Sequence, residues 1–231
     1  MKDVFARAPR IPSADRPWIK VCGVRSISDL NACAHSGATH VGVNTWPGSP
    51  RYVPEDRVPI LISAAREMGL APVLLTLPGS SWENNDIGRW GVEFLQLISP
   101  ISGDRRQRLA KGGTKIIEAR RTQMETIARK SWGDVLLLDA YVQGALGGTG
   151  RSFPWRVALQ APRPFVLAGG LGPHNVVDAI AACAPWGVDA ATGLESHPGF
   201  KDPGRIREFC AAAREGFLHL PGVTRACRTD S

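Results

Sequence analysis

Two side chains that can exchange protons stand at the ends of apolar, β-rich stretches. Cys22 follows the run Trp18–Val21, and a thiolate acts as a base or nucleophile when nearby positive charge lowers its pKa. Asp139 ends the apolar run Val135–Asp139. A lone cysteine is more often a small buried hydrophobic residue, and an aspartate after a strand is equally often a turn cap. The position of each residue in the fold has to decide between these roles.

Glycine-rich stretches follow three of the later apolar runs, as is typical of loops that approach a ligand closely. They are Gly147–Gly150, Gly169–Gly172 and the residues around Gly193. Backbone amides in such loops bind anions, especially where a helix begins behind them. The alternative for each stretch alone is a flexible connector. The last two stretches together indicate a phosphate site.

Arg51 lies in the proline-stiffened stretch Pro47–Tyr52, which follows the second β-rich run. An arginine held in such a loop can bind a carboxylate or a phosphate with two parallel hydrogen bonds. The alternative is an ordinary surface arginine. None of the histidines has a neighbour at metal-ligand spacing, so we expect no metal site.

Eight β-rich runs recur along the chain and must position these residues. They are Trp18–Val21, His40–Thr45, Pro72–Leu77, Val92–Leu97, Lys115–Ala119, Val135–Asp139, Phe165–Ala168 and Val188–Thr192. Most are continuously apolar, as expected for strands that are covered on both faces. Capping signals predict helices between them, over Ser28–Ser36, Pro54–Met68, Asn175–Ala182 and Arg205–Ala213.

Eight strand–helix units in 231 residues predict an α/β fold, a compact (β/α)8 TIM barrel in a single domain. An open doubly wound sheet is the rival, but it needs a glycine-rich turn after its first strand, and Cys22–Arg25 is not one. We expect an N-terminal extension over 1–17, the barrel over 18–215 and a tail over 216–231. Active sites of such barrels lie at the carboxyl ends of the strands, where Cys22 and Asp139 stand.

Composition limits the classes of partner and the compartment. Lys and Arg number 28 against 21 Asp and Glu, and the net charge of +7 suits anionic ligands. No basic stripe interleaved with aromatic residues indicates nucleic-acid binding, and no apolar run is long enough to cross a membrane. Five widely spaced cysteines without a C-x-x-C pair argue against a zinc site or a disulfide framework. We therefore expect a cytoplasmic protein.

An ordered series of motifs extends from Lys20 to about Ala213. It comprises Lys20–Gly23, Ser49–Val53, Leu95–Leu97, Leu137–Ala140, Gly147–Gly150, Leu167–Leu171, Gly187–Asp189, Gly193–Ser196 and Pro198–Asp202. In this order the motifs resemble those of the phosphoribosylanthranilate isomerases, the (β/α)8 barrels of tryptophan biosynthesis. Each motif alone is a weak signal, whereas the ordered set is specific for the family.

The resemblance implies an Amadori rearrangement of N-(5-phosphoribosyl)anthranilate to 1-(2-carboxyphenylamino)-1-deoxyribulose 5-phosphate, with no cofactor. It implies that Asp139 is the general acid, that Cys22 is the general base and that Arg51 binds the anthranilate carboxylate. Only a modest lowering of the thiol pKa is needed for that role. Further substrate contacts implied by the resemblance are Gly148, Gly169, Gly170, Asp189, Thr192 and Gly193. The expected partner is a small phosphoribosyl substrate, and the chain is expected to be a monomer or a homodimer.

The sequence departs from the family pattern near the expected site. Ile98 and Ser99 follow Leu97 where the family usually has His-Gly, Asn44 replaces an apolar residue, and Thr192 replaces a serine. These changes leave room for altered specificity or reduced activity. One alternative is therefore an isomerase of another phosphoribosylated amine, such as the aminoimidazole carboxamide intermediate of histidine synthesis. The other is a non-catalytic phosphosugar-binding paralogue.

Overall fold

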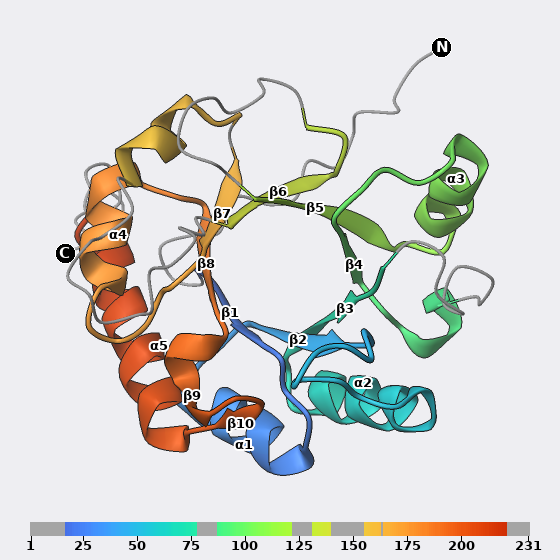
Figure 1. The fold of residues 1–231 in the computed structure, drawn as a ribbon, viewed down its shortest axis with the longest axis horizontal. Helices are drawn as coiled ribbons and strands as arrows, with labels where there is room; N and C mark the ends of the chain where they lie inside the picture. The colour runs from blue at the N-terminus through green and yellow to red at the C-terminus, as the bar shows by residue number, and fades with distance from the viewer. Residues whose placement is uncertain (1–16, 78–86, 122–130, 140–154, 163, 221–231) are drawn as a thin grey trace, which may run out of the picture.

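The computed structural model describes residues 17–77, 87–121, 131–139, 155–162 and 164–220. Eight parallel strands form a closed barrel in sequence order, and β1 pairs with β8 to complete the ring (Figure 1). The strands are β1 (Trp18–Cys22), β2 (His40–Asn44), β3 (Ala71–Leu75), β4 (Phe94–Leu97), β5 (Lys115–Arg121), β6 (Val135–Asp139), β7 (Phe165–Ala168) and β8 (Gly187–Ala190). The (β/α)8 prediction is confirmed, and closure excludes the open sheet.

Helices surround this ring (Figure 1). The α-helices are α1 (Ile27–Ser36), α2 (Val58–Glu67), α3 (Gly103–Lys111), α4 (Val176–Cys183) and α5 (Pro203–Leu218). The 3-10 helices are η1 (Glu55–Arg57), η3 (Ile87–Trp90), η4 (Trp155–Gln160) and η5 (Thr192–Leu194). A small antiparallel hairpin of β9 (Glu195–His197) and β10 (Phe200–Lys201) follows η5. The helix expected over Pro54–Met68 is thus divided into η1 and α2.

The ends of the helices follow capping chemistry, with one correction to the prediction. Helix α1 is capped by Ser26 and not by Ser28, because Ser26 Oγ accepts a hydrogen bond from the Asp29 amide while the Asp29 carboxylate accepts one from the Ser26 amide. Asp202 caps the start of α5, because its carboxylate accepts hydrogen bonds from the Gly204 and Arg205 amides. Helix α5 continues to Leu218, past the boundary expected at residue 215. The division into extension, barrel and tail stays a prediction, because 1–16 and 221–231 lie outside the described residues.

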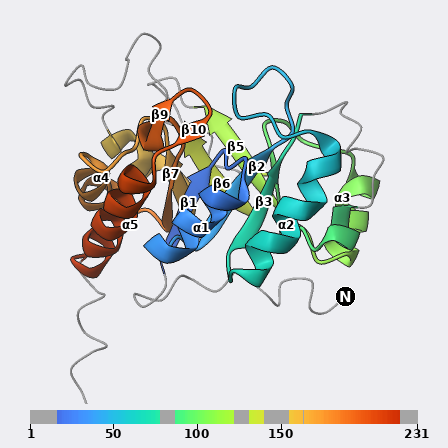
Figure 2. The same cartoon turned by 90° about the horizontal axis from the view of Figure 1, so that it is seen from below.

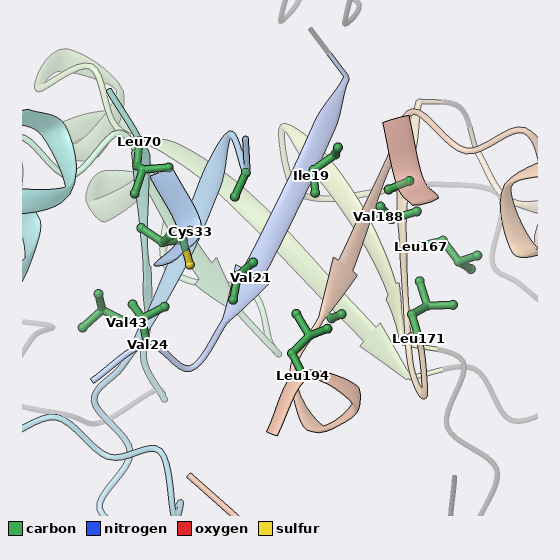
Figure 3. Close-up of a cluster of buried hydrophobic side chains, with 14 of the residues drawn as sticks. Ile19, Val21, Val24, Cys33, Val43, Leu70, Leu167, Leu171, Val188 and Leu194 are labelled. Atoms are coloured by element: carbon green, nitrogen blue, oxygen red, sulfur yellow. The ribbon is translucent and has the colours of Figure 1, made fainter. Parts of the chain in front are cut away.

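Alternate residues of each strand point to opposite faces, and this alternation separates two apolar clusters. One cluster lies between the barrel and the helices and includes Ile19 and Val21 from β1 and Val188 from β8 (Figure 3). The other fills the barrel interior and comprises Trp18, Val73, Phe94, Ile117, Val135, Leu137, Val166 and Ala168. The alternation therefore directs Cys22, two residues beyond Lys20 on β1, and Asp139, two residues beyond Leu137 on β6, to the interior face.

Aromatic rings close the amino-terminal end of the barrel. The Trp18 ring stacks on His40 at a centroid distance of 3.4 Å and lies 5.0 Å from Phe94 and 4.8 Å from Trp186. His40 is thus at the end opposite to the expected site, as its place at the start of β2 predicts. Among the described residues, no helix has the length and apolar character needed to span a bilayer.

Candidate active site

Cys22 ends β1 on the inner face of the barrel, where it is 8% exposed. Its register partner on β2 is Gly42, and a Cβ added to Gly42 would lie 2.9 Å from Cys22 Sγ. The thiol therefore occupies space that a larger residue on β2 would fill. Burial raises the pKa of the Cys22 thiol, while the positive charge of Lys20 opposes this rise. The modest lowering required by the proposed role concerns the thiol beside the cationic intermediate, and it stays a prediction.

Lys20 lies two residues before Cys22 on the same face of β1 and is fully buried. It pairs in register with Asp189 of β8, and Lys20 Nζ lies 3.0 Å from Asp189 Oδ2. Burial alone would lower the pKa of the Lys20 ammonium, but the Asp189 charge raises it above its ordinary value. Lys20 is accordingly a cation inside the barrel. The sequence reasoning did not select it, although the period-two pattern of β1 places it below Cys22.

Asp139 ends β6, and its register partners are Ala168 on β7 and Arg121 on β5. The residue is partly exposed, in contrast to the fully covered Leu138 before it. The alternation of β6 places it on the interior face at the carboxyl end of the barrel, which is also the end that holds Cys22. Gly148 and its loop lie outside the described residues.

Arg51, in the loop after β2, lies across the backbone that follows Cys22. Gly23 has φ +80°, and a Cβ at this position would lie 2.5 Å from Arg51 Cδ. The guanidinium donates from Nε and Nη2 to the two carboxylate oxygens of Glu195, both at 2.6 Å, and from Nη2 to Thr192 Oγ1 at 3.0 Å. The structure therefore brings Arg51 and Thr192 together next to the end of β1.

Glu195 is the buried anion that holds this arginine. Lys201 of β10 donates to Glu195 Oε1 at 2.8 Å, and the Glu195 carbonyl accepts from Arg205 at 2.5 Å. Burial alone would raise the pKa of the Glu195 carboxyl, but hydrogen bonds from Arg51 and Lys201 hold it below its usual value. The sequence reasoning missed Glu195 as a partner of Arg51. The one feature of the sequence that could have indicated Glu195 is its place as an acidic residue directly after the glycine loop that follows β8.

The loops after β7 and β8 are in direct backbone contact. A Cβ at Gly193 would overlap the Leu171 carbonyl oxygen, so only glycine permits this approach. The Asn175 side chain fastens the first loop, since it accepts from the Gly172 amide at 2.9 Å and donates to the Gly170 carbonyl at 3.0 Å. Gly169 and Gly170 both adopt positive φ. Five contacts with substrate stay predictions, namely those of Gly169, Gly170, Asp189, Thr192 and Gly193.

These elements gather at one end of the molecule. In Figure 2 the β9–β10 hairpin and the loop that follows β2 lie at the same end of the barrel. The Arg25 guanidinium joins them, because it lies over the Phe200 ring at 5.3 Å and donates to the Gly199 carbonyl. Within the described part of the chain, no three His, Cys, Asp or Glu side chains are grouped to hold a metal ion.

Comparison with known proteins identifies the family. The family model "N-(5'phosphoribosyl)anthranilate (PRA) isomerase" matches residues 19–212. The N-(5'-phosphoribosyl)anthranilate isomerase of Magnetococcus marinus is 36% identical over 207 residues, which cover 85% of this chain and 94% of the relative.

Solved structures agree with this match. TrpF from Jonesia denitrificans has a TM-score of 0.73 at 29% identity, over 87% of this chain and 98% of its own. Phosphoribosyl anthranilate isomerase from Thermotoga maritima has a TM-score of 0.70 at 25% identity, over 86% of this chain and 99% of its own. The chain therefore belongs to the N-(5'-phosphoribosyl)anthranilate isomerase family.

Proposed function

We propose that this chain isomerises N-(5'-phosphoribosyl)anthranilate to 1-(2-carboxyphenylamino)-1-deoxyribulose 5-phosphate, as a cytoplasmic enzyme of tryptophan biosynthesis. Membership of the family supports this reaction, and the family motifs coincide with the carboxyl ends of the strands. The substrate carries a carboxylate and a phosphate, which agrees with the net charge of +7. The reaction moves a proton between carbons of the substrate and needs no external oxidant.

Asp139 is the proposed general acid. It donates a proton to the ribose ring oxygen, the bond from that oxygen to C1′ breaks, and the nitrogen lone pair forms the iminium. Its position at the end of β6, on the interior face and at the same end of the barrel as Cys22, supports this assignment.

Cys22 is the proposed general base. Its thiolate removes the C2′ proton, the electrons of that C–H bond reduce the iminium to an enolamine, and tautomerisation gives the ketone. The iminium makes the C2′ proton acidic and supplies positive charge that favours the thiolate in the complex. In the free protein burial raises the pKa of this thiol, so ionisation depends on the charges brought close to it.

The binding groups are proposed from the same end of the barrel. Arg51 binds the anthranilate carboxylate, while Gly169, Gly170, Thr192 and Gly193 bind the phosphate with backbone amides and a hydroxyl group. Contact of the Arg51 side chain with the backbone after Cys22 is the observation that carries the proposal. Arg51 thus lies beside the residue proposed as base, which supports its proposed role in binding the substrate carboxylate.

The test is a turnover assay with freshly generated N-(5'-phosphoribosyl)anthranilate and the purified chain. We expect conversion to the aminoketose by the wild type and a loss of about 100-fold or more in kcat for Asp139→Asn, since general acid catalysis typically contributes this much. Restored growth of a tryptophan auxotroph that lacks this isomerase provides a second readout. Absence of turnover together with tight binding of a reduced product analogue would instead identify a non-catalytic paralogue.

The aminoimidazole carboxamide intermediate serves as the competing substrate in the same assay. Turnover of that compound, without turnover of the anthranilate compound, would show that the chain is an isomerase of another phosphoribosylated amine. Ile98 is 64% exposed at the end of β4, at the position where the family usually has histidine. It is thus the residue to examine first if the specificity differs.

A further inference from the structure

The interior of the barrel contains a charge that its packing does not require. The inward-facing residues around Lys20 include Trp18, Val73 and Phe94, which are apolar. A fully buried lysine is rare and loses its hydration, and an ion pair with one carboxylate seldom stabilises a fold more than apolar residues of similar volume. The pair of Lys20 and Asp189 therefore calls for a role other than stability.

The geometry connects this pair to the thiol. Lys20 and Cys22 are two residues apart on β1 and share its inner face, so their Cα atoms are separated by about 7 Å along the strand. An extended lysine side chain spans most of that distance, and the positive charge of Lys20 favours the Cys22 thiolate. Asp189 Oδ2, on the neighbouring strand β8, lies 3.0 Å from the ammonium. The lysine is thus close to both a carboxylate and the thiol.

We propose that Lys20 is a positioning residue which, held by Asp189 on the neighbouring strand β8, stabilises the thiolate of Cys22. The catalytic meaning of this inference rests on the proposed function, in which Cys22 is the base. The electrostatic relationship itself does not depend on the identity of the substrate.

The other neighbours of the thiol agree with this role. Lys201 from β10 adds a second positive charge that favours the thiolate, whereas Asp189 from β8 opposes it. On the β2 side, Gly42 and Asn44 are uncharged. Because Lys201 is already paired with Glu195 at 2.8 Å, Lys20 is the principal cation that favours the thiolate. Removal of the Lys20 charge should raise the titration midpoint of the thiol, whereas removal of the Asp189 charge should lower it.

Alkylation by iodoacetamide measures that titration without any substrate. The rate of Cys22 modification is followed from pH 6 to pH 11 by peptide mass spectrometry, with the buried Cys33, Cys183 and Cys210 as internal controls for unfolding. In Lys20→Met we expect the midpoint to rise by about one unit or more, with an approximately tenfold slower reaction at neutral pH. In Asp189→Asn we expect the midpoint to fall, because the negative charge that opposes the thiolate is removed.

Unchanged midpoints, or shifts in the same direction for both variants, would overturn the proposal. If Lys20→Met does not fold, the nearly isosteric Asp189→Asn decides the question alone, and a raised or unchanged midpoint rejects the proposal. The pH profile of kcat/KM provides a second readout and is expected to move with the alkylation midpoint. Failure of the wild type to turn over the anthranilate substrate would reject the proposed function, and the alkylation result would still stand.

Discussion

Arg51 and Glu195, which are 144 residues apart in the sequence, form a two-pronged ion pair with both hydrogen bonds at 2.6 Å. The arginine side chain is largely covered and the carboxylate is buried. Because Lys201 also binds Glu195, the carboxylate stays ionised and fixes the direction of the guanidinium. The carboxylate-binding group of the proposed site is therefore held in place before substrate arrives.

The first prediction concerns this arginine. Arg51→Met should raise KM about 10- to 100-fold with a smaller effect on kcat, because a hydrogen-bonded charged contact contributes roughly 1.5–3 kcal/mol. Glu195→Gln should give a smaller rise in KM, since the guanidinium remains but its orientation is no longer fixed. Arg25→Met is the matched control, because Arg25 covers the Phe200 ring instead. Equal KM values for Arg51→Met and Arg25→Met would refute the assignment.

The second prediction concerns the space beside the thiol. In Gly42→Ala the added methyl group meets Cys22 Sγ at 2.9 Å and Leu75 Cδ1 at 3.1 Å. Crowding of this kind destabilises a core by about 1–3 kcal/mol and should also reduce kcat by displacing the sulfur. Gly103→Ala is the control, because nothing lies within 4 Å of its added methyl group. Urea unfolding and turnover measure the two effects, and wild-type values for Gly42→Ala would contradict the close packing.

The third prediction concerns the pH dependence of activity. Burial raises the pKa of the Cys22 thiol above its ordinary value of 9.0, so this proposed base is mostly protonated in the free protein at neutral pH. The value of kcat/KM, which reports on the free enzyme, should therefore rise with pH from 7 towards 9. A steady-state profile with a stable substrate concentration at each pH checks this. A plateau that begins below pH 7 would show that the free thiol ionises more easily than its burial permits.

The fourth prediction concerns stability in alkali. Burial raises the pKa of Cys210 to about 12 and also raises that of Cys33, against an ordinary thiol value of 9.0. Above pH 9 the unfolded chain loses these protons while the folded chain retains them. The free energy of unfolding should then fall by up to about 1.4 kcal/mol per pH unit for each thiol until the folded thiol itself ionises.

Urea unfolding at pH 8, 9 and 10 measures this slope. The variant Cys210→Ala should have a shallower slope than the wild type, whatever its stability at pH 8. An identical slope in the two proteins would mean that Cys210 ionises equally in the folded and unfolded states.

The barrel itself could be predicted from the sequence because its strands carry a strong local signal. Val135–Asp139 and Phe165–Ala168 have the predicted bounds, since parallel strands covered on both faces are continuously apolar. Cys22 and Arg51 could be placed at the same end because strand ends define that end. The first residue of α1 could not be placed correctly, because Ser26 and Ser28 are both acceptable caps and only the reciprocal bond with Asp29 distinguishes them.

Contacts that depend on barrel closure could not be predicted. The pairing of Lys20 with Asp189 requires the register between β1 and β8, which are separated by most of the chain. The Arg51–Glu195 pair requires the loops after β2 and β8 to meet across β1. Neither relationship leaves a periodic trace in the sequence. The raised pKa of Cys22 has the same origin, because burial by neighbouring strands is a property of the closed barrel.

The most direct test of the account is the kcat/KM of Cys22→Ser for N-(5'-phosphoribosyl)anthranilate, measured beside Cys33→Ser. Cys33 is also buried but lies on α1, on the outer side of the barrel. Loss of a general base predicts that Cys22→Ser falls by about 10²–10⁴-fold, while Cys33→Ser retains activity in proportion to its folded fraction. A kcat/KM of Cys22→Ser within about twofold of the wild-type value would contradict the assignment of Cys22 as the base.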